Sequence, residues 1–365
     1  MQTNKFRKNI SFFILITISI TYLFLPSDTF AEEESKVIGV AQKQSFETVA
    51  NELSLIKDIS ALGSIELEST VFAVVFSQGG KFLITADERG GIRLWDTKKN
   101  YALDTVLEGH TKKIFSLDLS KDGKYLASAG KDQLIKIWDL SNKQLVKTIR
   151  DYKGSITAVV FSPDNTILAS SNLENVIEFW ATKEGEFYHV TDLTGIEESI
   201  YSMAFSPNSA YLVSAGKDKE ITIRPLGVDD KKKVLHNHTH VVLSVSFSPR
   251  GRFLASGGAD NVANLWKIKF AKKRLQIAPQ PAISYVHRGW VTKVKFSPDE
   301  KFFITASQSG DLRIWDLAKM KLIKIINVFS EKPIFDFSFS PQGRYLAVAG
   351  KGAVIIYDWQ QISSN

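Results

Sequence analysis

The sequence predicts an all-β fold, a closed ring of seven four-stranded antiparallel sheets, and three observations lead to this prediction. Short strand-like runs alternate with turn residues along most of the chain. A further strand-like segment precedes the first of these units. A short motif, "FSP" or a variant of it, recurs along the chain. Its copies start at Phe76, Leu119, Phe161, Phe205, Phe247, Phe296 and Phe339. Repeats of this length indicate one periodic body rather than several independent domains.

The spacing within the repeat is regular. Successive motif starts are separated by 43, 42, 44, 42, 49 and 43 residues. The position 19 residues after the start holds a tryptophan in five copies: Trp95, Trp138, Trp180, Trp266 and Trp315. The fourth copy has Arg224 there, and the last has Tyr357 after 18 residues.

Each unit contains the pattern of four strands. An apolar run such as "ITAVVFS" leads to a turn, "KYLASAG" follows as a second strand, and "LIKIWD" follows the tight turn at "KD". A weaker run such as "QLVKTIR" completes the unit. One such sheet cannot bury both of its faces, so neighbouring units must stack against it.

These units resemble WD-repeats, the family of β-propellers named for its Trp-Asp pair. The pair occurs here at Trp95-Asp96, Trp138-Asp139 and Trp315-Asp316, and the resemblance covers residues 58–359. It implies a seven-bladed β-propeller that acts as a scaffold for protein assemblies.

Ring closure is predicted from the two ends of the repeat array. Only seven residues follow Asp358, too few for a turn and a fourth strand. The strand-like segment "ALGSIELE", residues 61–68, has no unit of its own. We expect it to complete the last blade as its outer strand, which would leave no sheet edge open at the seam.

The first 31 residues have the pattern of a signal peptide. Lys5, Arg7 and Lys8 precede an apolar run over residues 10–25, and Thr29 and Ala31 are small residues at the expected cleavage site. The alternative is an uncleaved membrane anchor, although the run is shorter than the roughly 20 residues of a spanning helix. Either interpretation places the remaining chain outside the cytoplasm, as a periplasmic or secreted protein. The absence of cysteine excludes disulfides and a lipoprotein anchor.

Residues 32–57 are predicted to be a linker with a short amphipathic helix. Phe46, Val49, Ala50, Leu53 and Ile56 follow helical spacing. Residues 360–365 form a tail after the propeller.

The family resemblance implies a buried network in each blade, formed by a His before the first strand, a Ser or Thr on the second, an Asp in the tight turn and the Trp. Two copies match at every position: His110, Ser128, Asp132 and Trp138, and His238, Ser256, Asp260 and Trp266. The sixth copy keeps His287, Thr305 and Trp315 but has Ser309 for Asp. The same residue types form hydrolase triads. We favour a structural role, because the set recurs and no G-x-S-x-G elbow surrounds either serine.

Two further features depart from this pattern. In "HNHTH", His236, His238 and His240 alternate as metal ligands on a strand can, but His238 already belongs to the repeat network, so no metal site is expected. In the fourth copy, Arg224-Pro225 replaces Trp-Asp, which predicts a loosened blade; the alternative is a surface altered for a partner.

The sequence contains no phosphate-binding glycine loop, no paired acids in a recognisable setting and no metal constellation. We therefore expect a non-catalytic binding platform without a cofactor, a monomer within a larger assembly of protein partners. The alternative is a propeller hydrolase or lyase with a site at the central channel. Titratable groups with perturbed pKa values at the channel would indicate it.

Charge is distributed unevenly over the predicted ring. The net charge is +7, and removal of residues 1–31 would leave +5. The turns between strands one and two and between strands three and four emerge on one face, which collects most of the lysines and arginines. We call this the basic face. The candidate binding residues are Lys231, Lys232, Lys233, Lys267, Lys269, Lys272, Lys273 and Arg274, several of them in the insertion that lengthens the fifth unit.

The basic face has two interpretations. One is a solvated surface. The other is a docking face for an anionic partner such as lipid headgroups, an acidic polymer or an acidic protein patch. Nucleic acid is not the expected partner of an exported protein.

Overall fold

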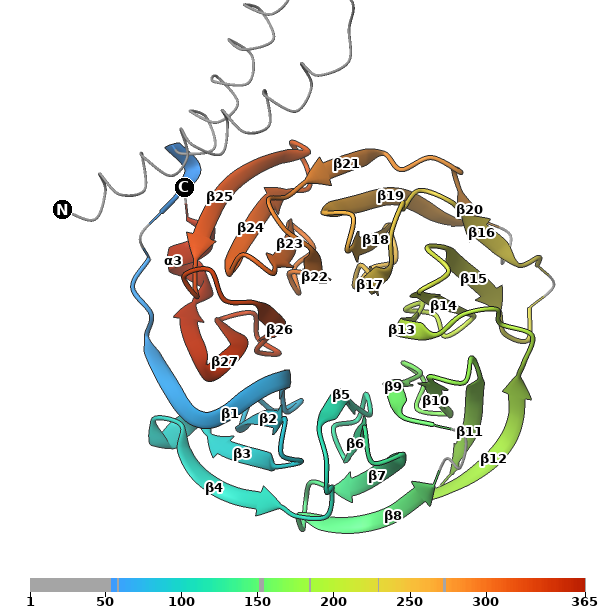
Figure 1. The fold of residues 1–365 in the computed structure, drawn as a ribbon, viewed down its shortest axis with the longest axis horizontal. Coiled ribbons are helices and arrows are strands. Elements are labelled where there is room, and N and C mark those ends of the chain that lie inside the picture. The colour runs from blue at the N-terminus through green and yellow to red at the C-terminus, as the bar shows by residue number, and fades with distance from the viewer. Residues whose placement is uncertain are drawn as a thin grey trace, which may run out of the picture. The chain divides into compact units, whose positions relative to one another are not determined.

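The strands are arranged in a closed ring around a common axis in a computed structural model of the chain (Figure 1). The structure describes residues 54–57, 59–150, 154–183, 185–228, 230–271 and 274–364. The predicted signal peptide and most of the predicted helix lie outside these residues. No helix in the described ranges is both long enough and apolar enough to cross a membrane.

The innermost strands follow the repeated motif and end at its start residues. They are β1 (Gly63–Phe76), β5 (Ile114–Leu119), β9 (Ile156–Phe161), β13 (Ile200–Phe205), β17 (Val242–Phe247), β22 (Val291–Phe296) and β26 (Ile334–Phe339). The second strands are β2 (Phe82–Asp87), β6 (Tyr125–Gly130), β10 (Ile167–Asn172), β14 (Tyr211–Gly216), β18 (Phe253–Gly258) and β23 (Phe302–Ser307).

The third strands carry the Trp position of the repeat. They are β3 (Ile92–Asp96), β7 (Leu134–Asp139), β11 (Ile177–Lys183), β15 (Ile221–Pro225), β19 (Val262–Ala271) and β24 (Asp311–Asp316). The outer strands are β4 (Ala102–Leu107), β8 (Gln144–Arg150), β12 (Glu186–Leu193), β16 (Lys233–Leu235), β20 (Arg274–Ile277), β21 (Ile283–Val286) and β25 (Lys321–Asn327). The chain ends with β27 (Tyr345–Asp358) and a short helix α3 (Trp359–Ser363); a 3₁₀ turn, η1 (Thr97–Lys99), follows β3.

The strands of the described residues assemble into six sheets. Four sheets have four antiparallel strands, and a fifth gains β21 beside β19. The sixth contains both ends of the array in the order β26-β27-β1-β2-β3-β4, and we call it the closing sheet. The prediction of seven separate four-stranded blades is therefore wrong. The physical reason is that β1 is one continuous strand shared by the first and last copies of the motif, which merges them into a single sheet.

The two halves of β1 have different partners. Gly63 lies opposite Ile356 and Ile65 opposite Val354 of β27, whereas Phe76 lies opposite Leu83 of β2. Ile65 is only 6% exposed and packs with Val354 and Ile356. The N-terminal strand therefore joins the C-terminal strand within one hydrogen-bonded sheet.

A second N-terminal segment lies against the outer edge of β25. Ile56 pairs in parallel with Ile325, and the Lys57 N–H donates to the Ile325 carbonyl at 3.0 Å. This segment covers an edge that the antiparallel sheet leaves unpaired.

Apolar side chains from neighbouring sheets interdigitate to form the core. Ile84 and Leu94 of the closing sheet, for example, pack with Ile114 and Leu126 of the next sheet, and all four are fully buried. Because each sheet has an apolar face on both sides, stacking around the ring buries them in turn.

The long insertion of the fifth unit forms a hairpin. The end of β19 pairs with β20, from Ile268 opposite Ile277 to Ala271 opposite Arg274. Leu275 of β20 is 2% exposed and packs in one apolar cluster with residues of β14 and β15. The hairpin therefore packs against the sheet of the fourth unit.

Candidate functional site

The polar residues of the second unit form a continuous hydrogen-bonded chain. His110 Nε2 lies 2.8 Å from Ser128 Oγ, His110 Nδ1 lies 2.8 Å from Asp132 Oδ2, and Trp138 Nε1 donates to Ser128 Oγ at 2.9 Å. Burial opposes ionisation of Asp132, but hydrogen bonds from His110 and from two backbone N–H groups outweigh it and hold the pKa below its usual value. The side chain of His110 has no exposed surface, so a substrate could not reach it.

The fifth and sixth units contain partial versions of this chain. His238 bonds to Ser256 at 2.7 Å and to Asp260 at 2.8 Å, but Trp266 Nε1 has no hydrogen-bond partner among the residues that the structure describes. His287 bonds to Thr305 at 2.7 Å, and Trp315 Nε1 donates to Thr305 at 3.1 Å.

In the sixth unit, the serine at the position of the turn aspartate does not take over the contact with the histidine. Ser309 does not reach His287; its backbone N–H donates to Ser307 Oγ at 3.1 Å. Burial, together with the nearby Arg313 guanidinium, lowers the pKa of His287 to about 3, so this imidazole is neutral at physiological pH.

The histidines of "HNHTH" do not come together as ligands. His236 is exposed and pairs with Glu220 at 3.1 Å, His238 belongs to the network, and His240 is exposed. No group of three or more metal-ligating side chains is present in the part of the chain that the structure describes.

The arginine of the fourth unit occupies the tryptophan position of its neighbours. Arg224 Nη1 donates to Ser214 Oγ at 2.6 Å, as Trp138 does to Ser128. Burial lowers the pKa of Arg224, and burial raises that of Asp218, to which Arg224 is electrostatically coupled. Ser214 thus has a partner, contrary to what the loss of Trp suggests.

Titratable groups of different innermost strands lie close to one another, where the sequence placed the central channel. Lys295 Nζ lies 2.9 Å and Lys293 Nζ 3.5 Å from Asp336 Oδ1, and burial raises the pKa of Asp118 to about 6. Both carboxylates also accept backbone N–H groups of the next innermost strand: Asp118 from Phe161 at 2.7 Å and Asp336 from Val74 at 3.1 Å.

A repeated irregularity occurs in the innermost strands, at the end of the ring axis that we call the mouth. Each innermost strand changes register by one residue just after an Ile or Val. Such bulges turn a side chain out of the sheet. The residues at this position are Phe72, Phe115, Thr157, Tyr201, Leu243, Thr292 and Phe335.

Aromatic rings therefore collect around this mouth, on the face opposite the basic face. Phe72 and Phe335 have ring centroids 4.5 Å apart, and Lys113 Nζ lies 3.8 Å above the Phe72 ring. Tyr201 is 37% and Trp290 46% exposed. We call Phe72, Phe115, Tyr201, Trp290 and Phe335 the mouth cluster. This cluster is not among the residues predicted from the sequence, although the recurring "VF", "IF" and "IY" before the motif is a usable signal.

The candidate lysines of the basic face differ in exposure and in whether they form an ion pair. Lys233 is held by Asp230 at 2.8 Å, whereas Lys267 and Lys269 are exposed on either side of the buried Ile268 and form no ion pair within the described residues. Lys231 and Lys232 are exposed just before β16, and Arg274 begins β20. Lys272 and Lys273 lie outside the described residues.

The pair Lys233–Asp230 belongs to a structural contact of the insertion hairpin. Tyr211 Oη donates to Asp230 at 2.7 Å, and the Leu275 N–H donates to Tyr211 Oη at 2.8 Å. Burial opposes the charge on Asp230, but hydrogen bonds from Lys233, Tyr211 and two backbone N–H groups keep its pKa low. Lys233 is therefore not an available docking cation.

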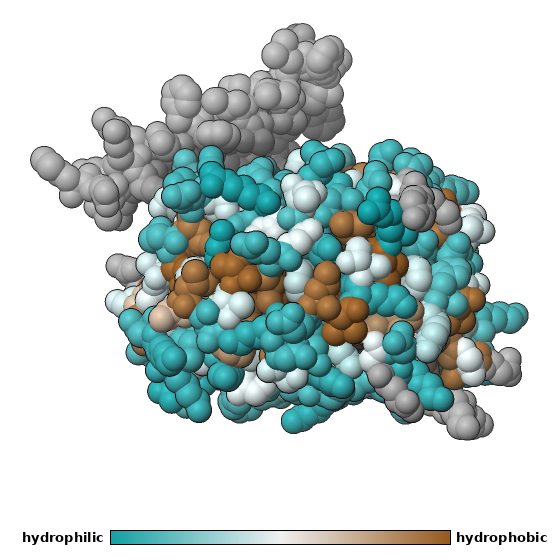
Figure 2. Space-filling view, turned by 90° about the horizontal axis from the view of Figure 1, so that it is seen from below, coloured by the Kyte–Doolittle hydropathy of each residue, from teal (hydrophilic) through white to brown (hydrophobic). Residues whose placement is uncertain are grey.

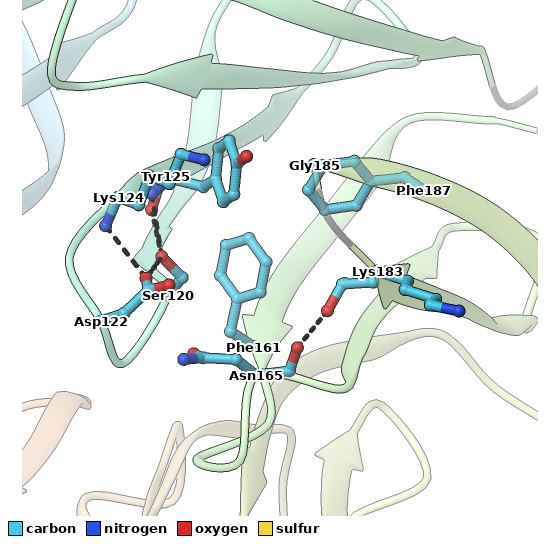
Figure 3. A pocket seen from close by; sticks show the side chains of 10 residues that line it. Ser120, Asp122, Lys124, Tyr125, Phe161, Asn165, Lys183, Gly185 and Phe187 are labelled. Carbon is cyan, nitrogen blue, oxygen red and sulfur yellow. Dashed lines mark hydrogen bonds between the residues drawn. The ribbon is translucent and has the colours of Figure 1, made fainter.

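A small pocket of about 240 Å³ also lies on the basic face, between the second and third units (Figure 3). Its walls are the rings of Tyr125, Phe161 and Phe187, which face one another, with Lys124 and Lys183 at the rim.

Comparison with known proteins identifies the repeat. The family model described as "WD domain, G-beta repeat" matches six segments, residues 62–96, 102–139, 143–181, 187–223, 230–267 and 280–316. Six matched repeats agree with six sheets and not with the predicted seven.

Three relatives show the extent of similarity. Protein groucho of Drosophila melanogaster is 23% identical over 71% of this chain and 34% of its own length. A guanine nucleotide-binding protein subunit beta of Arabidopsis thaliana is 26% identical over 70% of each chain. The Arabidopsis thaliana pre-mRNA-processing factor 19 homolog 2 is 24% identical over 56% of this chain and 38% of its own length. This chain therefore spans only about a third of the first and third relatives.

Proposed function

We propose that this chain, which belongs to the WD40 family of WD domain, G-beta repeat proteins, is a non-catalytic platform that binds protein partners outside the cytoplasm. One relative is named as a subunit, the guanine nucleotide-binding protein subunit beta. The word subunit identifies that relative as a component of an assembly. A role within an assembly is the part of this proposal that the relatives support.

The mouth cluster is the observation that carries the proposal. Exposed Tyr and Trp side chains are typical anchors of protein interfaces, because they bury much apolar surface at little entropic cost. Phe72, Phe115, Tyr201 and Phe335 lie on bulges of the innermost strands, which the ring of sheets holds in place, and Trp290 directly precedes β22. A partner would meet a preformed surface.

Paired variants test this surface. The mature chain is used to capture partners from the extracytoplasmic fraction of its source, and a Tyr201→Ala/Trp290→Ala variant is compared with wild type. We expect the captured proteins to be lost from this variant. Val286→Ala, a change at a 70% exposed outer-strand residue, should retain them. Equal capture by all three proteins would contradict a role for the mouth cluster.

The location rests on residues 1–31 alone. Fusing residues 1–40 to a reporter that is active only outside the cytoplasm should give activity, which the substitution of charged residues in the apolar run 10–25 should abolish. An inactive fusion would remove the export part of the proposal and leave the platform intact.

The basic face supports a second binding role, toward an anionic partner such as lipid headgroups or an acidic polymer. Exposed Lys267 and Lys269 carry it. Lys267→Glu/Lys269→Glu should weaken binding to vesicles containing anionic lipid at low salt. The control Lys131→Glu/Lys351→Glu changes two exposed lysines on the opposite face and should leave binding unchanged. Salt-insensitive binding would identify the face as a solvated surface.

We do not favour the alternative of a channel hydrolase or lyase, although the raised pKa of Asp118 is the kind of shift that marks catalytic acids. Asp118 and Asp336 each accept an N–H from a neighbouring innermost strand. We assign these carboxylates the role of holding the strands around the channel together.

A further inference from the structure

The circumference of the ring carries an apolar band that neither the mouth cluster nor the basic face includes. Six exposed large apolar side chains lie on the three consecutive outer strands β4, β8 and β12: Leu103, Val106, Leu145, Val146, Tyr188 and Val190. Figure 2 views this edge of the ring, and hydrophobic side chains gather across it. Each of the three strands is the last of its sheet.

Lysine contacts link these outer strands. Lys147 Nζ of β8 donates to the Phe187 carbonyl of β12 at 2.7 Å and lies 5.8 Å from the centre of the Tyr188 ring. Lys143, just before β8, forms an ion pair with Asp104 of β4. The band is therefore a continuous surface whose central strand is β8.

The outer strand β25 shows what such an edge can bind. There, residues 55–57 of the chain itself add a parallel segment, with Ile56 opposite Ile325. Because the Ile325 carbonyl accepts the Lys57 N–H, the backbone groups of this residue point out of the sheet.

The strands β8 and β25 are equivalent in sequence and register. β8 reads "QLVKTIR" and β25 reads "KLIKIIN". Leu145 lies opposite Trp138 and Leu322 opposite Trp315, and both strands shift register immediately afterwards. Thr148 of β8 thus corresponds to Ile325, and its N–H and C=O point outward in the same way.

The two edges differ in coverage. Leu322 and Ile323 of β25 are half-buried and Ile325 is 4% exposed, whereas Leu145 and Val146 of β8 are each 43% exposed and Thr148 is exposed. Among the described residues no strand pairs with the outer edge of β8. An apolar edge of this kind is a template for strand addition.

We propose that the outer edge of β8 binds an extended segment of a partner protein by parallel strand addition. The segment presents a β-branched apolar residue opposite Thr148, as Ile56 does opposite Ile325, and its neighbouring apolar side chains cover Leu145 and Val146. Main-chain hydrogen bonds supply affinity, and the apolar side chains supply selectivity. This inference rests on the proposed role in protein binding but uses a surface separate from the mouth cluster.

The probe is a fluorescent peptide of residues 53–60, "LSLIKDIS", added to the mature chain. We expect saturable binding that is at least tenfold weaker in Thr148→Pro, which removes an outward donor, and in Val146→Lys. Val106→Lys is the matched control, since it makes the same change at a residue 38% exposed on β4, and should bind like wild type. Melting temperatures show whether each variant is folded. If Thr148→Pro does not fold, Val146→Lys alone still tests whether the peptide binds at β8.

Hydrogen exchange locates the bound peptide. Protection at residues 144–150 is expected. Protection only at residues 321–327 would mean that the peptide replaces the chain's own segment on β25 and would overturn the proposal. Equal binding of a scrambled peptide, or no binding, would also overturn it. A Tyr201→Ala/Trp290→Ala variant should still bind the peptide, so failure of the mouth cluster and failure of the β8 edge are distinguishable.

Discussion

At the scale of single residues, buried polar groups are satisfied by partners that the repeat supplies at equivalent positions. Trp138 donates to Ser128 in the second unit, and Arg224 donates to Ser214 in the fourth. A different donor therefore fills the same place. The residue types resemble a hydrolase triad, but full burial of His110 separates them from any substrate.

Removing the turn aspartate should leave buried hydrogen-bond donors without an acceptor and so lower stability. Asp132→Ala leaves His110 and the Thr111 N–H without their acceptor, so we expect a loss of ~1–3 kcal/mol in the free energy of unfolding, measured by denaturant titration. Glu174→Ala, at an exposed residue in a tight turn of the next unit, is the control and should change stability by less than about 0.5 kcal/mol. Similar small effects of both changes would mean that the network contributes little.

The channel carboxyl of Asp118 should make stability depend on pH. Burial raises its folded pKa from 3.8 to about 6, so the stabilising protonated form is fully present below pH ~4 and is lost as the pH rises through 6. The difference of about two pKa units corresponds to at most ~3 kcal/mol, and channel water would reduce it. Wild type should therefore lose stability relative to Asp118→Asn between pH 4 and 6. Parallel pH profiles of the two proteins would contradict the raised pKa.

At the scale of elements, the insertion hairpin β19–β20 supports the most divergent unit. The fourth unit has an outer strand of only three residues, β16. Leu275 of the hairpin packs on this sheet, and its N–H bonds to Tyr211, which is 1% exposed. The insertion thus supplies packing that a short outer strand cannot.

Truncation of the hairpin contact should loosen the fourth unit. Leu275→Ala removes a buried side chain, so we expect a loss of ~2–4 kcal/mol and faster hydrogen exchange in β14 and β15. Gln276→Ala changes the exposed neighbouring residue and should have little effect. Unchanged exchange in β14 and β15 after Leu275→Ala would show that the hairpin is only peripheral.

At the scale of the whole molecule, stability depends on how the ends of the array meet. β1 crosses the seam as one strand, and Asp336 of β26 accepts the Val74 N–H of β1 near the channel. The closing sheet is therefore stabilised at its inner side by this hydrogen bond and at its outer side by the pairing of β1 with β27. An array closed in this way has no free end from which unfolding can begin.

Deleting residues 58–68 should lower the melting temperature sharply, because it removes the β1 half that pairs with β27. Ile65→Asp tests the same contact without deletion: it places a charge in an apolar cluster and should cost ~3–5 kcal/mol. Removal of residues 32–44 and Glu66→Lys, at an exposed residue of the same strand, are the controls and should matter little. Equal, small effects of all four changes would contradict closure through β1.

The sequence by itself determined the strands, the turns and the repeat, because each depends on a local pattern of apolar and turn residues. The pairing of residues 63–66 with β27 also followed from a count of the strands left over at each end. Only the tertiary structure decided that there are six sheets, because no local pattern shows that one strand belongs to two units. It alone placed Phe72 beside Phe335, brought Leu275 to Tyr211 and Asp230, and left the outer edge of β8 without a partner strand among the described residues. Each of these depends on which distant parts of the chain the closed ring brings into contact.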